Sequence, residues 1–147
     1  MPGPGQGFVD AYNLDGSFQR RVAGQGSLDA PWGLALAPVG FGAFAAGDLL
    51  VGNFGDGRIN VFDSNTDAFL GQLSGTDGKP LFIDGLWALM PDNTGNGYPS
   101  GIYFSAGPND EMNGLFGVIT ATPEPGSVAL LALGLAGLGF GRRRHSG

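Results

Sequence analysis

Short runs of apolar residues recur along the first 120 residues and are separated by turn-forming Gly, Asn and Asp. Runs of this length that are bounded by turn residues are typical of β-strands. In residues 58–63 polar and apolar positions alternate, which predicts a strand with only one buried face. We therefore expect an all-β body with strands at residues 8–12, 17–22, 31–38, 48–53, 58–63, 68–73, 85–91, 102–104 and 114–119.

The strand pattern repeats along the chain. Residues 85–91 align with residues 32–38 at an offset of 53, and residues 9–12 align with residues 59–62 at an offset of 50. A unit of about fifty residues that holds four short strands is typical of a β-propeller blade. The rhythm of strand, Asp/Asn-Gly turn and strand resembles propellers of the NHL and six-bladed kind.

This resemblance implies a partial β-propeller of about two and a half four-stranded blades over residues 8–120. Residues 8–22 are the outer half of one blade, residues 31–73 a complete blade and residues 81–120 most of a third. The alternative is a small, complete β-sandwich whose hairpins are similar by chance.

Two observations favour the C-terminal part of a longer protein. Two and a half blades do not close a ring, and repeat folds need neighbours to cover each hydrophobic face. Residues 1–7 have neither the basic nor the apolar region of a secretory signal, so we expect them to form a flexible N-terminal segment.

Residues 126–141 contain no charge and only one hydroxyl side chain. As a helix they would extend over roughly 24 Å, slightly less than the roughly 30 Å of a bilayer core. An amphipathic packing helix has a polar face, whereas this run is apolar all round and rich in Gly, which is common in membrane helices. We expect one C-terminal transmembrane helix over residues 127–141; the alternative is a buried helix of a soluble domain.

A basic tail, residues 142–147, follows this helix and contains Arg142, Arg143 and Arg144. Arginines beside a membrane helix stay on the cytoplasmic side, which predicts a single-pass orientation with the body on the opposite side. Before the helix lies a Pro-rich linker, residues 121–126, that contains the tripeptide Pro123, Glu124 and Pro125.

The order of Pro-Glu-Pro, short apolar helix and arginine cluster resembles the PEP-CTERM sorting signal of bacterial exported proteins. The resemblance covers residues 123–144 and implies that a membrane-embedded exosortase processes the chain. It implies Pro123, Glu124 and Pro125 as the sorting motif and the three arginines as the orientation signal. The protein would then pass through the inner membrane to the cell envelope or to an extracellular biofilm matrix. Its expected partners are the exosortase, membrane lipid and, as a candidate, an exopolysaccharide.

The amino-acid composition limits the kinds of binding and active site that the body can contain. Residues 1–141 carry four basic and thirteen acidic side chains, and this net negative charge disfavours nucleic-acid binding. The chain has no Cys, and its single His, His145, lies in the tail, so no thiol nucleophile, Ser-His-Asp triad or His-ligated zinc site is expected in the body. We predict a protein without catalytic residues, metal or cofactor, and not an enzyme.

An exported propeller enzyme is the alternative, a lactonase- or hydrolase-like protein whose active site lies largely outside these residues. In such enzymes loop oxygens at the channel hold Ca²⁺, and Asp29, Asn53 and Asp84 flank the matching strands. We favour a turn-forming role for these three residues and a solvated loop for residues 109–111.

Two roles are possible for the two tryptophan side chains. Trp32 and Trp87 occupy similar places in two apolar strands, where they either stack on a sugar or fill the space between blades. We favour core packing. The basic pair Arg20 and Arg21 is expected to have no function of its own.

Overall fold

The computed structural model describes residues 2–92 and 101–122, and this part of the protein is all-β. Its strands are β1 (Phe8–Tyr12), β2 (Phe18–Gly24), β3 (Pro31–Leu36), β4 (Leu49–Asn53), β5 (Ile59–Phe62), β6 (Phe69–Gln72), β7 (Leu86–Pro91), β8 (Gly101–Ala106) and β9 (Leu115–Thr120). Each predicted strand is confirmed, with bounds that shift by a few residues at most. The described residues contain no helix that is long and apolar enough to span a bilayer.

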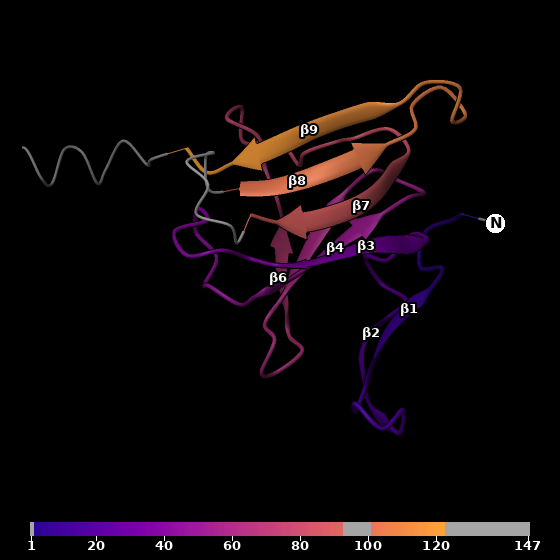
Figure 1. The fold of residues 1–147 in the computed structure, drawn as a ribbon, viewed down its shortest axis with the longest axis vertical. Helices are drawn as coiled ribbons and strands as arrows, with labels where there is room; N and C mark the ends of the chain where they lie inside the picture. The colour runs from indigo at the N-terminus through magenta and orange to yellow at the C-terminus, as the bar shows by residue number, and fades with distance from the viewer. Residues whose placement is uncertain (1, 93–100, 123–147) are drawn as a thin grey trace, which may run out of the picture.

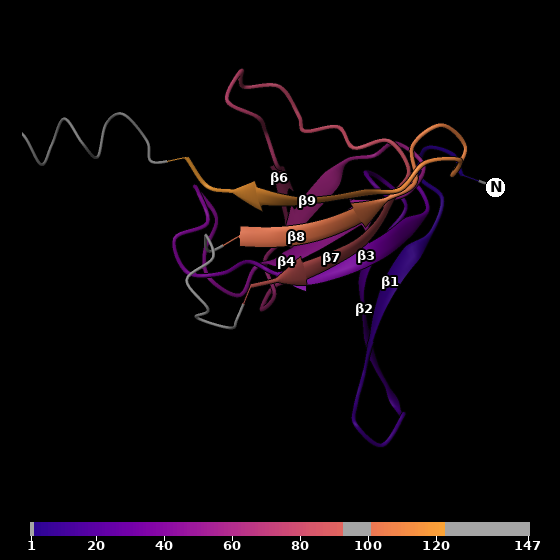
Figure 2. The same cartoon turned by 45° about the horizontal axis from the view of Figure 1, so that its top comes forward.

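The strands form three antiparallel sheets in which neighbours in the sequence are neighbours in space. We call them the hairpin sheet (β1-β2), the middle sheet (β3-β4-β5-β6) and the C-terminal sheet (β7-β8-β9). The hairpin sheet extends away from the other two, as Figures 1 and 2 show. The three sheets fall within residues 8–24, 31–72 and 86–120, so each corresponds to one of the predicted repeat units, with the first extending two residues beyond it. Their identity as propeller blades stays a prediction.

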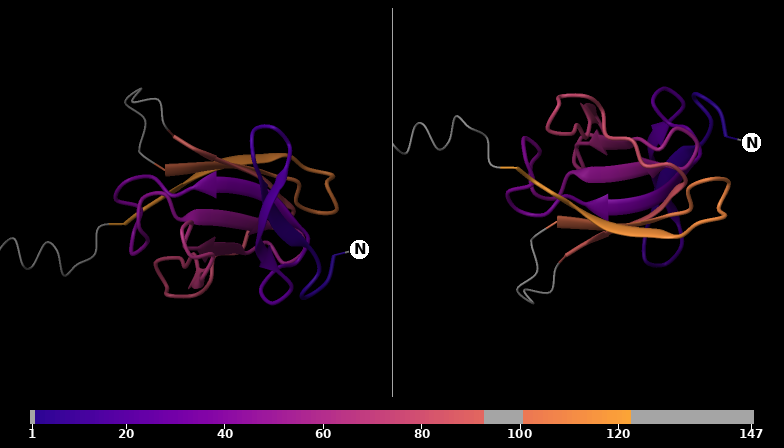
Figure 3. Two further views of the ribbon diagram at one scale, coloured as in Figure 1. Left: turned by 90° about the horizontal axis from the view of Figure 1, so that it is seen from below. Right: turned by 90° about the horizontal axis from the view of Figure 1, so that it is seen from above.

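An apolar core lies against each face of the middle sheet, which Figure 3 shows from two further directions. One core lies between it and the C-terminal sheet and includes Leu50, Ile59 and Val61 together with Leu86 and Ile102. These five side chains are fully inaccessible to solvent. Leu50 and Val61 are cross-strand partners, and their side chains therefore share one face of the sheet.

The second core lies on the opposite face of the middle sheet. Val51 and Phe62 pack there against Val9 and Ala23 of the hairpin sheet and against Leu28 from the loop between β2 and β3. Because adjacent strand residues point to opposite faces, Leu50 and Val51 contribute to different cores. The middle sheet therefore forms the central layer, with apolar side chains on both of its sides.

This arrangement corrects the sequence prediction for β5. Alternation predicted one exposed face, but all four residues of β5 are buried. The polar residue in it, Asn60, is fully inaccessible to solvent. Its side chain donates a hydrogen bond to the carbonyl oxygen of Ser27 (2.9 Å) and accepts one from Gln72 (3.0 Å). A polar residue in a strand therefore signals here a satisfied buried amide and not a solvent-facing position.

The strand ladders also refine the predicted repeat. The pairing register shifts after the first residue of β3 and of β7. In β3 the paired residues are Pro31 and then Gly33, and in β7 they are Leu86 and then Ala88. The equivalent positions of these two strands are therefore 55 residues apart, two more than the sequence alignment gave. Trp32 and Trp87 are the extra, unpaired residue of each irregularity and are equivalent to one another.

The described part of the N-terminal segment packs against the loop before β3. Gly5 donates a backbone hydrogen bond to the carbonyl oxygen of Leu28 (2.8 Å), and Ala30 donates one to that of Gln6 (2.9 Å). The amide of Gly3 is 2.6 Å from a carboxylate oxygen of Asp29. These contacts connect the segment to the body, and its flexibility stays a prediction.

Candidate functional site

The predicted sorting residues Pro123, Glu124 and Pro125, the apolar helix and the three arginines lie outside the described residues. What the structure describes is the attachment point of this tail. β9 ends at Thr120, which pairs with Gly101, and Ala121 and Thr122 follow as exposed residues. β9 is also the last strand of its sheet, so the tail follows from an edge of the described body (Figure 1).

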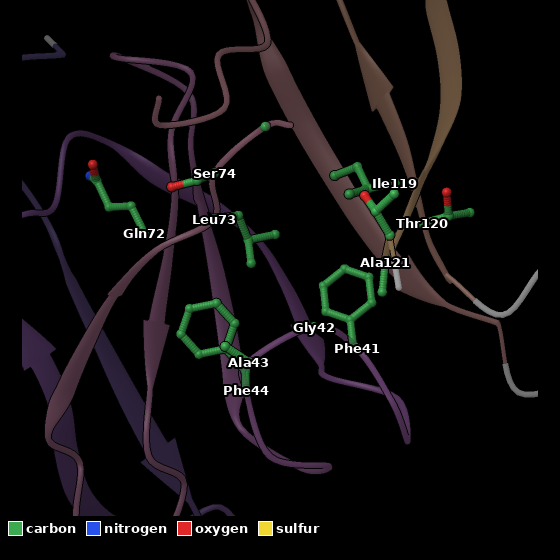
Figure 4. A pocket seen from close by; sticks show the side chains of 12 residues that line it. Phe41, Gly42, Ala43, Phe44, Gln72, Leu73, Ser74, Ile119, Thr120 and Ala121 are labelled. Carbon is green, nitrogen blue, oxygen red and sulfur yellow. The ribbon is translucent and has the colours of Figure 1, made fainter. Parts of the chain in front are cut away.

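A pocket of about 380 Å³ lies beside this attachment point. It is formed where the loop between β3 and β4, the end of β6 and the end of β9 meet. The rings of Phe41 and Phe44 face the space together with Leu73 and Ile119 (Figure 4). Thr122, directly before the predicted motif, completes the lining.

The side chains that line this pocket can bind another group or pack against it. Its remaining lining comes from Gly, Ala, Ser, Thr and Gln residues, and none of the described lining residues is ionisable. The sequence analysis predicted only a loop at residues 39–47 and missed the pocket. The two phenylalanines in an otherwise Gly- and Ala-rich loop were the signal, and Phe41 is buried with 4% exposure.

The proposed calcium ligands do not converge on an ion site in the described residues. Asp29 accepts its hydrogen bond from Gly3, and Asp84 accepts one from the amide of Asn109 (3.1 Å). Asn53 donates to the carbonyl oxygen of Ser27 (2.8 Å), and its own side-chain oxygen has no hydrogen-bond partner in the structure. Nowhere in residues 2–92 and 101–122 do three or more His, Cys, Asp or Glu residues gather as metal ligands would. Each of these three side chains bonds to a residue 25 or 26 positions away in the chain, so it links two segments and does not close its own turn.

Residues 109–111 form a tight turn. Asn109, Asp110 and Glu111 all have positive φ angles of 58°, 53° and 65°. Glu111 donates a backbone hydrogen bond to Gly107, and Met112 donates one to Asn109. The three side chains are exposed, in agreement with a solvated loop.

The two tryptophans contradict the predicted core packing. Trp32 is 72% exposed and Trp87 is 41% exposed. The physical reason is the irregularity in each strand, because an unpaired bulge residue need not follow the inward and outward alternation of its neighbours. The structure therefore places both indoles at the surface, and no described contact assigns them a ligand.

Two arginine–carboxylate pairs organise the hairpin sheet. Arg20 reaches Asp67 in the turn between β5 and β6, with Nε 2.7 Å from Oδ2 and Nη2 3.1 Å from Oδ1. Arg21 pairs in the same way with Asp10 of β1, and its guanidinium lies 4.1 Å above the ring of Phe8. The hydrogen bond that Arg21 donates holds the pKa of Asp10 below its usual value, and the hydrogen bond that Arg20 donates to Asp67 raises the pKa of Arg20. Both arginines thus have structural partners.

The chain is similar to three uncharacterized proteins of Acanthamoeba polyphaga mimivirus. They are 46%, 43% and 34% identical over 78%, 81% and 82% of this chain. The matches cover only 29%, 28% and 22% of the viral proteins, so the chain spans less than a third of their length. No solved structure matches the chain.

The C-terminal segment matches a protein family. The PEP-CTERM protein-sorting motif covers residues 121–144, which includes the tripeptide, the apolar segment and the three arginines. The match begins at Ala121, one residue after β9 ends. The chain therefore carries a PEP-CTERM protein-sorting motif joined directly to the last strand of its described β body.

Proposed function

We propose that this protein is a non-enzymatic component of the cell envelope or extracellular matrix, exported and then processed by an exosortase-type membrane enzyme. The match of residues 121–144 to the PEP-CTERM motif is the observation that carries this proposal. In it, Pro123, Glu124 and Pro125 are the recognised element, residues 127–141 span the inner membrane once, and the arginines remain on the cytoplasmic side.

The geometry at the end of β9 supports this role for the tripeptide. Only Ala121 and Thr122 separate the last paired residue from Pro123, and both are exposed. A proline disfavours helical backbone in the residue before it, which keeps such a junction extended. An enzyme in the membrane would therefore meet an accessible, extended segment close to the folded body.

We propose further that the three sheets are parts of consecutive propeller blades. The support is the repeated ladder, in which β3 and β4 pair in the same register and with the same irregularity as β7 and β8. The middle and C-terminal sheets also pack face to face, as successive blades do. Because the viral relatives are more than three times as long as the matched region, additional blades would come from a longer protein.

The non-enzymatic part of the proposal rests on the inventory of reactive side chains. The chain has no cysteine, and its single histidine lies beyond the arginines. Asp29 and Asp84 are engaged in loop hydrogen bonds. Outside the cytoplasm, an exopolysaccharide is a candidate partner of the body.

Two sets of substitutions in the native host test the sorting proposal. Replacing Arg142, Arg143 and Arg144 with Ser should disturb the orientation, and replacing Pro123, Glu124 and Pro125 with Ala should leave unprocessed chain in the inner membrane. The matched control replaces His145 and Ser146 with Ala, directly outside the matched motif, and should be sorted normally. Unchanged localisation and mass in both motif variants would refute the proposal.

A further inference from the structure

The basic side chains of the described body differ in their partners. Arg20 and Arg21 are both ion-paired with carboxylates. Arg58 and Lys79 form no ion pair with a carboxylate anywhere in the described part of the chain. Both of them line a pocket of about 570 Å³ that is formed largely by the loop between β6 and β7. In a body with an excess of acidic residues, the two unpaired cations therefore share one site.

The carboxylates that precede these cations in the sequence are bonded to the backbone. Asp56 accepts a hydrogen bond from the amide of Arg58, and Asp77 accepts one from the amide of Lys79, both at 3.0 Å. A carboxylate that bonds to the amide two residues later closes its own turn. Asp77 also lines the pocket. These carboxylates reduce the local positive charge, but the side-chain N–H groups of both cations stay available to another anion.

The loop that carries Lys79 is longer than its counterpart one sheet earlier. Residues 73–85 connect β6 with β7, whereas only residues 25–30 connect β2 with β3. The longer loop contains a small hairpin in which Ser74 and Pro80 are bridge partners, and Lys79 lies directly before this bridge. Figure 2 shows the loop beside β6. The extra hairpin therefore brings Lys79 to the pocket.

Contacts with the same loop position Arg58. Its Nη1 donates a hydrogen bond to the carbonyl oxygen of Pro80, and its guanidinium carbon lies 5.7 Å from the centre of the Phe82 ring. None of the hydrogen bonds in the described structure uses its Nε or Nη2. This edge is the one with which Arg20 binds the carboxylate of Asp67. Phe82 is 60% exposed, so it offers a flat apolar surface beside the free edge of the guanidinium.

We propose that this pocket binds a carboxylate attached to a six-membered ring. Arg58 donates two parallel hydrogen bonds to the carboxylate, Lys79 adds a second positive charge, and Phe82 packs against the face of the ring. Asp56 and Asp77 disfavour a more highly charged ligand, because like charges repel. An acidic sugar unit and an aromatic acid share this chemistry. The site goes beyond the proposed function, which assigns no residue to ligand binding, and it is independent of the sorting of the tail.

An NMR titration of the full-length, isotope-labelled protein in a mild detergent tests the site. The probes are sodium glucuronate and sodium benzoate, with glucose and sodium acetate as controls, at constant ionic strength. We expect a ring carboxylate to shift the amide signals of residues 74–83 in a saturable way, and the controls to bind at least about tenfold more weakly. Saturation by glucuronate alone would identify an acidic sugar, and saturation by benzoate alone an aromatic acid.

Three variants separate binding from folding. Arg58→Gln removes the two donors and should weaken binding by at least about tenfold. Lys79→Gln removes an exposed charge, so it should weaken binding several-fold and leave the thermal midpoint unchanged. The matched control, Arg21→Gln, removes the same charge from an ion-paired arginine and should bind normally.

Four results would overturn the proposal. The first is the absence of saturable shifts with both ring carboxylates. The second is binding of acetate or glucose as tight as that of the ring carboxylates. The third is binding that survives in both Arg58→Gln and Lys79→Gln, and the fourth is an equal loss of binding in Arg21→Gln.

Discussion

Asn53 and Asn60 are buried amide side chains that share one acceptor. Both donate to the carbonyl oxygen of Ser27, at 2.8 Å and 2.9 Å. Asn60 also accepts from Gln72 and thereby links the loop before β3 with β5 and β6. In the dry middle of the sheet, each of these hydrogen bonds compensates for polar groups that have lost contact with water.

Replacing Asn60 with Ala should therefore be strongly destabilising. The change removes the donor to the carbonyl oxygen of Ser27 and the acceptor for the side-chain amide of Gln72, and we expect a loss of about 1–3 kcal/mol in the free energy of unfolding. Urea denaturation followed by circular dichroism measures it. Asn65→Ala, in the exposed turn after β5, is the matched control and should change stability little. Equal stability of the two variants would show that the buried network contributes nothing.

Gly33 sets the distance between the middle and C-terminal sheets. A methyl group at this position would lie 2.7 Å from the carbonyl oxygen of Trp87 and 3.0 Å from the amide of Leu89. Both are backbone atoms, so neither can move aside without shifting β7. The sequence shows glycines between and within strands but does not indicate which of them lie against another backbone.

The Gly33→Ala variant tests this contact. Overpacking of this kind costs about 1–3 kcal/mol of stability, since the two sheets must separate. Gly114→Ala is the control, because a methyl group there would meet no atom within 4 Å. Thermal melting of both variants gives the comparison; a Gly33→Ala protein as stable as the Gly114→Ala protein would contradict the close packing.

The turns of the two hairpins are stabilised by carboxylates. Asp15 accepts hydrogen bonds from the amide and hydroxyl of Ser17, and Asp63 accepts from the amides of Asn65 and Thr66. These bonds lower the pKa of both carboxyls from the usual 3.8, and Arg21 lowers that of Asp10. Each group binds its proton more weakly in the folded than in the unfolded chain.

Stability should therefore fall in acid. The contribution of these carboxylates is fully present above the unfolded pKa and is lost as the pH falls through the lower folded value. We expect the thermal midpoint to drop between about pH 6 and about pH 3. Asp63→Asn, which does not titrate at this position, should show a smaller drop. A midpoint that is independent of pH over this range, or a variant that falls as steeply, would exclude this role.

Much of the strand pattern was readable from the sequence. Strand positions follow from short apolar runs and from turns such as Asn13–Gly16, where Gly16 has a φ of 86° and Asp15 bonds to its own loop. These signals are local, so they survive in the structure without any knowledge of the neighbouring layers. The tripeptide and the arginines were also readable, because the motif is contiguous and matches residues 121–144.

The sequence did not indicate how deeply each strand is buried. β5 alternates like a surface strand, yet it is buried because a second layer, the hairpin sheet, covers the face that carries Asn60 and Phe62. Trp32 and Trp87 belong to apolar strands, yet a bulge turns each of them outward. Both errors arise from contacts between segments far apart in the chain, which periodicity within one segment cannot report.

The whole body is a stack of three sheets that differ in how completely they are covered. The middle sheet has apolar contacts on both faces, while the hairpin and C-terminal sheets each have one face turned outward. The sorting segment begins at the edge of the C-terminal sheet and next to the pocket formed by Phe41 and Phe44. The proposed processing site is therefore close to this edge strand and to the pocket.

The most direct test of this account is the intact mass and fractionation of the native protein from its own host. Sorting and processing predict a product that ends near residues 123–126 and is found outside the inner membrane. A chain that extends to Gly147 and occurs in the soluble cytoplasm would contradict the proposed export and processing.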